Sequence, residues 1–164
     1  MEILNDFSTS VHKALEEIDP NYLKYPGVVV CGTHTPHNEE DLIAKITECR
    51  VDGTPYLGIC FGHQLAAIEW ARNNGIPDAT SEEFGEGTPV VKALPKLKVG
   101  LVDGESYWHR YEVVIDWKKP DHFFTCQFHP EYQSSKDKPH PLLVKFLSYA
   151  KYVYEYDLAM QSST

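Results

Sequence analysis

The chain has 164 residues, of which 42% are hydrophobic and 24% charged. These values are ordinary for a folded globular protein, so they exclude a disordered chain and predict one domain over residues 1–164, with a core over about 25–150. The net charge of −9 argues against a nucleic acid or an anionic membrane as partner. No apolar run approaches the length of a membrane span, so no membrane partner is expected.

The cysteines indicate a reducing compartment. They show no C-x-x-C spacing, and three of them lie in or next to apolar segments. The residues after Met1 also lack the basic and then apolar pattern of a signal peptide. We therefore expect a cytoplasmic protein with reduced thiols. The four cysteines are Cys31, Cys49, Cys60 and Cys126.

The first part of the chain predicts a short strand followed by a helix. Residues 3–4 are enough for only a short strand. Val11, Leu15 and Ile18 lie at i, i+4 and i+7, which is the spacing of one helical face. This helix should end where Pro20 follows, because the residue before a proline is disfavoured in the helical conformation.

A β-α-β unit is predicted over the next forty or so residues. The apolar run 28–31 is typical of a central parallel strand, and residues 32–37 form a loop. Asn38 then begins a helix with acidic residues in its first turn, and the turn at 52–53 leads into a strand over 56–59. Because such crossovers are right-handed, the loop after residue 31 should lie beside the end of the second strand.

Cys60 sits at a tight turn between that strand and a following helix. Gly58 and Gly62 flank it at minus two and plus two, which is the cysteine form of the nucleophile elbow. The turn is crowded, so only glycines are expected to fit at those two positions. The helix over about 62–74 directs its positive end at the sulfur and favours the thiolate. The alternative is a buried structural cysteine between two turn glycines.

The middle of the chain gives weaker signals. Residues 80–91 are predicted to form a loop, and residues 98–102 a strand that ends in a turn at 103–104. Pro141 should begin a last helix. The tail 161–164 is expected to fray.

A second candidate for chemistry follows the apolar, aromatic strand predicted over 123–128. His129 lies at the end of this strand, where catalytic groups of parallel sheets collect, and Glu131 could orient its ring. With Cys60 these residues supply a nucleophile, a base and an orienting carboxylate. By itself, a histidine after a strand is more often an ordinary surface residue.

These two segments carry a family resemblance. The run 58–64 (Gly-Ile-Cys-Phe-Gly-His-Gln) together with 128–131 (Phe-His-Pro-Glu) resembles the class I, or triad, glutamine amidotransferase domain. The blocks 67–73, 79–84 and 107–113 are most similar to the amidotransferase domain of CTP synthase and its stand-alone relatives. The resemblance implies a single α/β domain, with a mostly parallel sheet, helices on both faces and a trimmed region between the two segments.

The resemblance also implies an activity. Cys60 would attack the side-chain amide of glutamine, His129 would move the proton, and Glu131 would orient His129. Ammonia would leave, and water would release glutamate from the thioester. The residues implied to bind the substrate are Gly32, Phe61, Gln64, Glu83 and Arg110, with Gly32 and the N–H of Phe61 at the oxyanion.

One departure from the family pattern concerns the oxyanion loop. The family's Pro-Gly-Gly is here Cys31-Gly32-Thr33, and a β-branched residue resists positive φ. Two alternatives stand beside a glutaminase. One is a hydrolase of another γ-glutamyl compound, with a wider pocket that the trimmed region would permit. The other is a non-catalytic regulatory protein of the same fold, which Thr33 and the missing strands of the trimmed region motivate. An acceptor enzyme for ammonia would be a separate chain, and a homo-oligomer is possible.

The same place also contains residues that suit a metal ion. His34, His37 and His63 could gather near Cys60, and imidazole and thiolate are ligands that suit zinc. Their spacing matches no zinc motif, and a metal on Cys60 would quench the nucleophile. The prediction is therefore a site with no metal and no cofactor.

Overall fold

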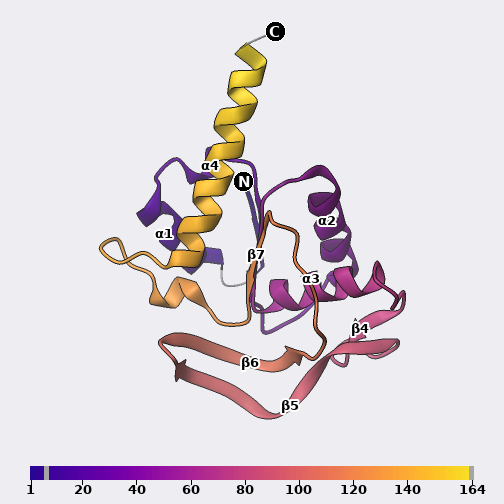
Figure 1. Ribbon diagram of the computed structural model, residues 1–164. Helices are drawn as coiled ribbons and strands as arrows, with labels where there is room; N and C mark the ends of the chain where they lie inside the picture. Colours follow the sequence, from indigo (N-terminus) through magenta and orange to yellow (C-terminus); the bar gives the residue numbers. More distant parts are fainter. Residues whose placement is uncertain (6–7, 163–164) are drawn as a thin grey trace.

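The computed structural model describes residues 1–5 and 8–162 (Figure 1). Its helices are α1 (Ser8–Ile18), α2 (Glu39–Asp52), α3 (Phe61–Arg72) and α4 (Pro141–Ser162), with short 3-10 helices η1 (Tyr22–Lys24) and η2 (Pro130–Gln133). Its strands are β1 (Glu2–Leu4), β2 (Val28–Val30), β3 (Tyr56–Ile59), β4 (Ala79–Ser81), β5 (Thr88–Val102), β6 (Glu105–Val113) and β7 (Phe123–Cys126).

A parallel sheet in the order β1-β2-β3-β7 lies between two layers of helices (Figure 1). Every residue of β2 and β3 is buried, which explains their continuous apolar sequences. Val28 and Val30 belong to the cluster with α2 and α3, whereas Val29 belongs to the cluster with α1 and α4. The expected single α/β domain, with a mostly parallel sheet and helices on both faces, is confirmed.

The topology brings two distant segments to one edge of this sheet. β3 and β7 are neighbours, and Ile59 at the end of β3 pairs with Cys126 at the end of β7. Cys60 and the residues after Cys126 therefore leave the sheet side by side, at the carboxyl edge where ligands bind in open α/β sheets.

A second sheet, β4-β5-β6, lies below this edge and corrects one prediction (Figure 1). Residues 80–91 were predicted to be a loop, but they include part of β4 and the start of β5. The prediction was wrong because Thr80 and Ser81 are buried although polar, so the short strand β4 has no apolar pattern. The strand predicted over 98–102 is only the end of β5, which pairs antiparallel with β6 to form what we call the β5–β6 ribbon.

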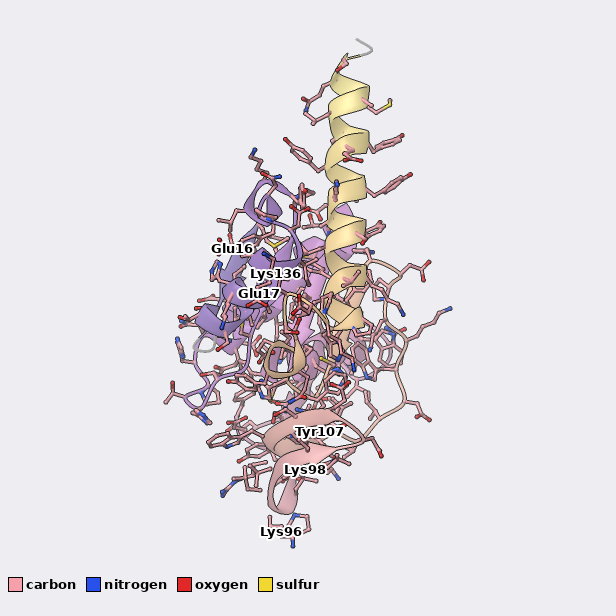
Figure 2. The ribbon with its side chains drawn as sticks, turned by 90° about the vertical axis from the view of Figure 1, so that its left-hand side faces the viewer. Glu16, Glu17, Lys96, Lys98, Tyr107 and Lys136 are labelled. Carbon is pink, nitrogen blue, oxygen red and sulfur yellow. The ribbon has the colours of Figure 1, made fainter. Side chains whose placement is uncertain are left out.

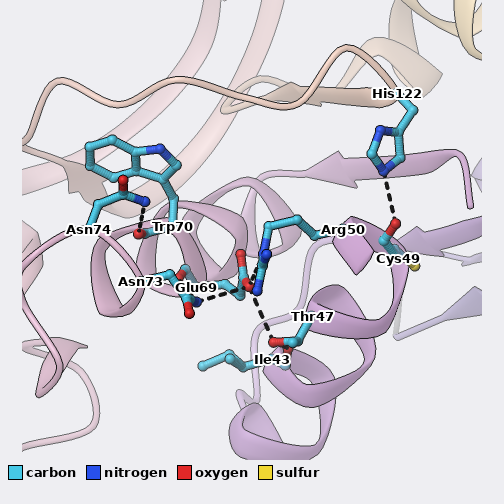
Figure 3. A network of polar contacts seen from close by, with 9 residues as sticks. All are labelled: Ile43, Thr47, Cys49, Arg50, Glu69, Trp70, Asn73, Asn74 and His122. Carbon is cyan, nitrogen blue, oxygen red and sulfur yellow. Dashed lines mark hydrogen bonds and ion pairs between the residues drawn. The ribbon is translucent and has the colours of Figure 1, made fainter. Parts of the chain in front are cut away.

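A buried carboxylate joins the two helices on one face of the parallel sheet (Figure 3). Glu69 of α3 is 2% exposed and accepts hydrogen bonds from Arg50 Nε (2.6 Å), Thr47 Oγ1 (3.3 Å) and Asn73 Nδ2 (3.1 Å). Three donors offset the cost of burying the charge. The network holds α3, and with it the turn at Cys60, against α2.

The last helix begins at Pro141 as predicted but runs on to Ser162. Its first half is packed on the parallel sheet, and its second half projects from the molecule (Figures 1 and 2). Residues 161–162 of the tail that was expected to fray are helical, and residues 163–164 lie outside the described part of the chain. Across the described residues, we find no helix with the length and apolarity needed to cross a membrane.

Candidate active site

Cys60 occupies a strained turn between β3 and α3. Its backbone has φ 56° and ψ −101°, a conformation that a non-glycine residue rarely adopts. A Cβ on Gly58 would lie 2.7 Å from the carbonyl oxygen of Gly62, and a Cβ on Gly62 would overlap the carbonyl oxygen of Val30. The elbow predicted from the two glycines is therefore present, for the steric reason expected.

The structure brings Cys60, His129 and Glu131 together at this edge. The three residues are 7%, 1% and 6% exposed. His129 is hydrogen-bonded to the sulfur of Cys60, and its Nδ1 lies 2.7 Å from Oε1 of Glu131. This is the geometry of a nucleophile, a proton carrier and an orienting carboxylate.

The charge state of His129 depends on these two partners. Burial alone would lower its pKa, but the hydrogen bonds to Cys60 and Glu131 outweigh burial and raise that pKa to about 10. The ring also stacks on Tyr132, and the backbone N–H of His129 donates to the carbonyl of Ser106 on β6 (2.7 Å). These partners therefore favour the protonated imidazole, and the ring is held in place from two sides.

The other cysteines lie in surroundings that disfavour the thiolate. Burial raises the pKa of Cys31, of Cys126 and of Cys49, the last to about 12. All four thiols are free. Among them, only Cys60 combines a helix N-terminus with a histidine partner.

A cavity of about 260 Å³ opens over Cys60. This volume is slightly below the usual range of about 300–1,000 Å³ for drug-sized ligands, which suits a ligand the size of an amino acid. It is lined by Thr33, His34, Pro36, Cys60, Phe61, Gln64, Glu83, Leu97, Trp108, His109, Arg110 and Tyr111. Four of the five predicted substrate-binding residues are among them, and they come from three separate elements or loops.

Two charged side chains of the cavity have no counter-charge. Among the described residues, Arg110 makes no hydrogen bond or ion pair through its guanidinium, and the carboxylate of Glu83 has no hydrogen-bond donor. Burial, and then the negative charge of Glu39, raise the pKa of Glu83. An unpaired acid and an unpaired guanidinium in one cavity complement the ammonium and the carboxylate of an amino acid.

The fifth predicted residue, Gly32, is buried and is not among the residues that line the cavity, although its neighbour Thr33 is. Neither Gly32 nor Thr33 has a positive φ. The hydroxyl of Thr33 instead accepts a hydrogen bond from the backbone N–H of Thr35 (3.1 Å) and closes a local turn. The loop is thus held by the side chain that replaces the family's second glycine.

The three histidines that the sequence suggested as metal ligands have different surroundings and different contacts. His34 packs edge-on against Trp108 at the cavity, and Nδ1 of His37 hydrogen-bonds within its own loop. His63 lies behind the elbow with Nδ1 2.9 Å from the hydroxyl of Thr125. The described residues hold no group of three or more potential metal ligands.

Three groups near the sulfur of Cys60 or in the cavity were not predicted from the sequence. The carbonyl oxygen of Trp108 lies 3.8 Å from the sulfur of Cys60, and the amide nitrogen of Gln127 lies 3.5 Å from it. Nε2 of His109 bonds Glu112 (2.7 Å), while its buried Nδ1 has no partner among the described residues. Trp108 and His109 lie within the block 107–113, and Gln127 directly precedes the segment 128–131, but nothing in a local pattern indicates which group faces the sulfur.

Comparisons with known proteins agree with this geometry. The sequence model of a family described as "Glutamine amidotransferase class-I" matches residues 5–119, a range that includes the elbow and ends before His129.

Curated relatives include the CTP synthases of three archaea. Those of Methanoregula boonei, Archaeoglobus fulgidus and Methanothrix thermoacetophila are 31%, 32% and 33% identical to this chain, over 80%, 81% and 84% of its length. The alignments cover 35%, 36% and 35% of those proteins, so the chain spans about a third of their length.

A solved structure shares the fold. The glutaminase domain of the Trypanosoma brucei CTPS, with bound acivicin, superposes with a TM-score of 0.73 at 23% identity. The superposition covers 90% of this chain and 89% of that one.

Proposed function

Because the chain belongs to the class-I glutamine amidotransferase family, we propose that it hydrolyses the side-chain amide of glutamine to glutamate and ammonia. The observation that carries the proposal is the buried Cys60–His129–Glu131 arrangement beneath a cavity with unpaired Glu83 and Arg110. Arg110 would bind the α-carboxylate and Glu83 the α-ammonium, which directs the side-chain amide of the substrate toward the sulfur.

The first chemical step is formation of a thioester. The thiolate of Cys60 attacks the amide carbon, and the negative charge that develops on the oxygen is stabilised by the N–H of Phe61, the first residue of α3. The C–N bond then breaks, and protonated His129 gives its proton to the nitrogen, which leaves as ammonia. Protonation of His129 at neutral pH, as its pKa of about 10 implies, suits this acid role.

The second step releases glutamate. His129, now neutral, takes a proton from water, and the hydroxyl attacks the thioester carbon. The C–S bond breaks, the sulfur departs as a thiolate, and His129 keeps the proton for the next cycle. Glu131 keeps the ring in one orientation throughout through its 2.7 Å contact with Nδ1.

The test is release of glutamate and ammonia from glutamine by the purified chain. We expect turnover in the wild type, loss of turnover in Cys60→Ser, and covalent labelling of Cys60 by a glutamine-like electrophile. Absence of both turnover and labelling would overturn the proposal. Labelling without turnover would keep the site and point to activation by a partner, for which an ammonia-accepting synthase is proposed because the curated relatives are CTP synthases.

A second candidate is hydrolysis of another γ-glutamyl compound. Trp108 is 50% exposed and its ring lies 5.1 Å from that of His34, so two aromatic rings border the cavity. An aromatic border could pack against a larger amine than ammonia. Comparing kcat/KM for glutamine and γ-glutamyl anilides distinguishes the two, since a preference for the anilide would favour this candidate.

A further inference from the structure

We propose that the side-chain amide of Gln127 donates a hydrogen bond to the sulfur of Cys60 and stabilises its thiolate, and that Gln64 holds Gln127 in the donating orientation. The catalytic meaning rests on the proposed function, but the hydrogen bond itself can be tested without any substrate. Gln127 contacts the reacting sulfur, whereas Gln64 acts only through Gln127 and is a positioning residue.

The position of Gln127 follows from the sheet. β7 ends at Cys126, opposite Ile59 at the end of β3, so the next residues of the two strands are Gln127 and Cys60. The backbone N–H of Cys60 donates to the carbonyl of Cys126 (2.8 Å), which fixes the distance between the segments. A side chain that leaves β7 at residue 127 is therefore within reach of the sulfur.

The orientation of Gln127 is determined by a chain of hydrogen bonds. The carbonyl of Tyr111 can only accept, so the amide nitrogen of Gln64 must face it, at 2.8 Å. The same nitrogen lies 3.4 Å from Oε1 of Gln127. With its oxygen turned toward Gln64, Gln127 directs its amide nitrogen at the sulfur of Cys60, at 3.5 Å. Each orientation depends on the one before, and the first is set by the backbone.

The sulfur needs such a donor because another neighbour opposes the thiolate. The carbonyl oxygen of Trp108 lies 3.8 Å from the sulfur, and it can accept a hydrogen bond only from the thiol. A hydrogen bond to the charged form of a group favours that form, and one to the neutral form disfavours it. Gln127 and His129 therefore favour the thiolate, while Trp108 favours the thiol.

The hydrogen bonds that link the Tyr111 carbonyl, Gln64, Gln127 and the sulfur of Cys60, which we call the relay, also limit the groups that Gln64 can offer a substrate. Its side chain is buried, and its two amide hydrogens are directed at Tyr111 and Gln127. Only its oxygen is left to face a ligand in the cavity. The resemblance implies a substrate-binding role for Gln64, and within this proposal that role falls to its side-chain oxygen.

The experiment measures the rate of alkylation of Cys60 by iodoacetamide as a function of pH, with peptide mass mapping to identify the site. The variant Gln127→Met keeps the length of the side chain and removes the N–H donor. We expect the midpoint of the pH profile to rise by about one unit, with alkylation at neutral pH slower by roughly tenfold. Gln64→Met should shift the profile in the same direction by less.

The matched control is Gln133→Met. Gln133 is exposed and lies on η2, in the same segment of the chain, but not in the relay. Its profile should coincide with that of the wild type. If Gln127→Met loses stability, Gln127→Asn, which is too short to reach the sulfur and keeps the amide, should give the same upward shift.

Profiles of Gln127→Met or Gln127→Asn that superimpose on the wild type would overturn the inference, whether or not glutamine is hydrolysed. A shifted profile in a protein that does not hydrolyse glutamine would support the hydrogen bond while the proposed function fails. Hydrolysis of glutamine by the wild type, together with unshifted profiles in the Gln127 variants, would support the proposed function and exclude the hydrogen bond.

Discussion

The parallel sheet and the β5–β6 ribbon meet at the cavity but differ in nearly every physical respect. β2 and β3 are buried along their whole length, and their neighbours are helices on both faces. In the ribbon, the side chains of Val99, Leu101 and Trp108 are 62%, 67% and 50% exposed. The ammonium of Lys98 on β5 lies 4.1 Å from the ring centroid of Tyr107 on β6 (Figure 2). One region is rigid through burial, and the other is a two-stranded extension of a small sheet.

This difference indicates that the two regions have different roles in the proposed reaction. Cys60 is held where a strained backbone is fixed by packed strands and a helix, because a nucleophile must be placed accurately. Arg110 and Trp108 come from β6 and are exposed, so these two side chains can change without disturbing that packing. We therefore expect substitutions in the parallel sheet and its elbow to affect chemistry or folding, and substitutions in the ribbon to affect substrate affinity and choice.

The largest expected effect is at Cys60. Cys60→Ser should lower glutamine turnover by about four to six orders of magnitude, as loss of a triad member does elsewhere. Limiting iodoacetamide at neutral pH should label Cys60 first, because burial raises the pKa of the other three thiols. Turnover is measured by glutamate release and labelling by peptide mass mapping. Preferential labelling of another cysteine would contradict the prediction.

A substitution at the elbow should reduce stability rather than affinity. In Gly62→Ala the added methyl group overlaps the carbonyl of Val30, so β2 and α3 must separate. We expect a loss of about 1–3 kcal/mol in the free energy of unfolding, measured by urea denaturation. In the ribbon, where Leu101 is exposed, Leu101→Ser should change the free energy of unfolding by less than about 0.5 kcal/mol. Equal losses in both variants would remove the contrast between the two regions.

A substitution in the ribbon should reduce affinity rather than chemistry. Arg110→Lys keeps the positive charge but loses the paired donors of the guanidinium. We expect a loss of about 1.5–3 kcal/mol in transition-state binding, so that kcat/KM for glutamine falls roughly 10- to 160-fold through a higher KM with kcat little changed. Steady-state kinetics over a range of glutamine concentrations separates the two constants. An unchanged KM would show that Arg110 does not bind the substrate.

His63, in the first turn of α3 after the elbow, should give the stability of the protein a pH dependence. Burial, with the nearby charges of Lys119 and His109, lowers the pKa of His63 to about 4. The unfolded chain binds a proton at its ordinary value of about 6.5, so stability is constant above that pH and falls between 6.5 and 4. His63→Asn should remove about 1–2 kcal/mol of that fall, measured as the free energy of unfolding at pH 7 and pH 5. Parallel curves for the two proteins would contradict the assignment.

The smallest expected effect is in the loop after β2. Thr33→Gly gives the backbone access to positive φ and lets an N–H turn toward the developing oxyanion. We expect glutamine turnover to rise, by less than about tenfold, because the turn that the Thr33 hydroxyl closes must first open. Thr33→Ser keeps the hydroxyl and should leave turnover near that of the wild type. An unchanged rate in Thr33→Gly would exclude the loop as the limit on activity.

The parts of the fold that were predicted correctly are those that leave a local pattern. The apolar runs of β2 and β3 are continuous because both faces of the sheet are covered, and the helix after Asn38 begins with acidic residues. β4 could not be predicted because its polar residues are buried by partners far away in the chain. The length of α4 could not be predicted, because its second half projects from the domain and carries no single apolar face.

The sequence by itself determined the elbow at Cys60 and the segment with His129 and Glu131. In the first, two glycines flank the cysteine at the spacing that marks a crowded turn, and in the second the two groups lie only two residues apart along the chain. Only the tertiary structure decided that Glu83 and Arg110 share a cavity with Cys60, and that Gln127 directs its amide nitrogen at the sulfur. Those relations depend on pairing between distant strands and on hydrogen bonds to backbone carbonyls, and neither leaves a period or a spacing in the sequence.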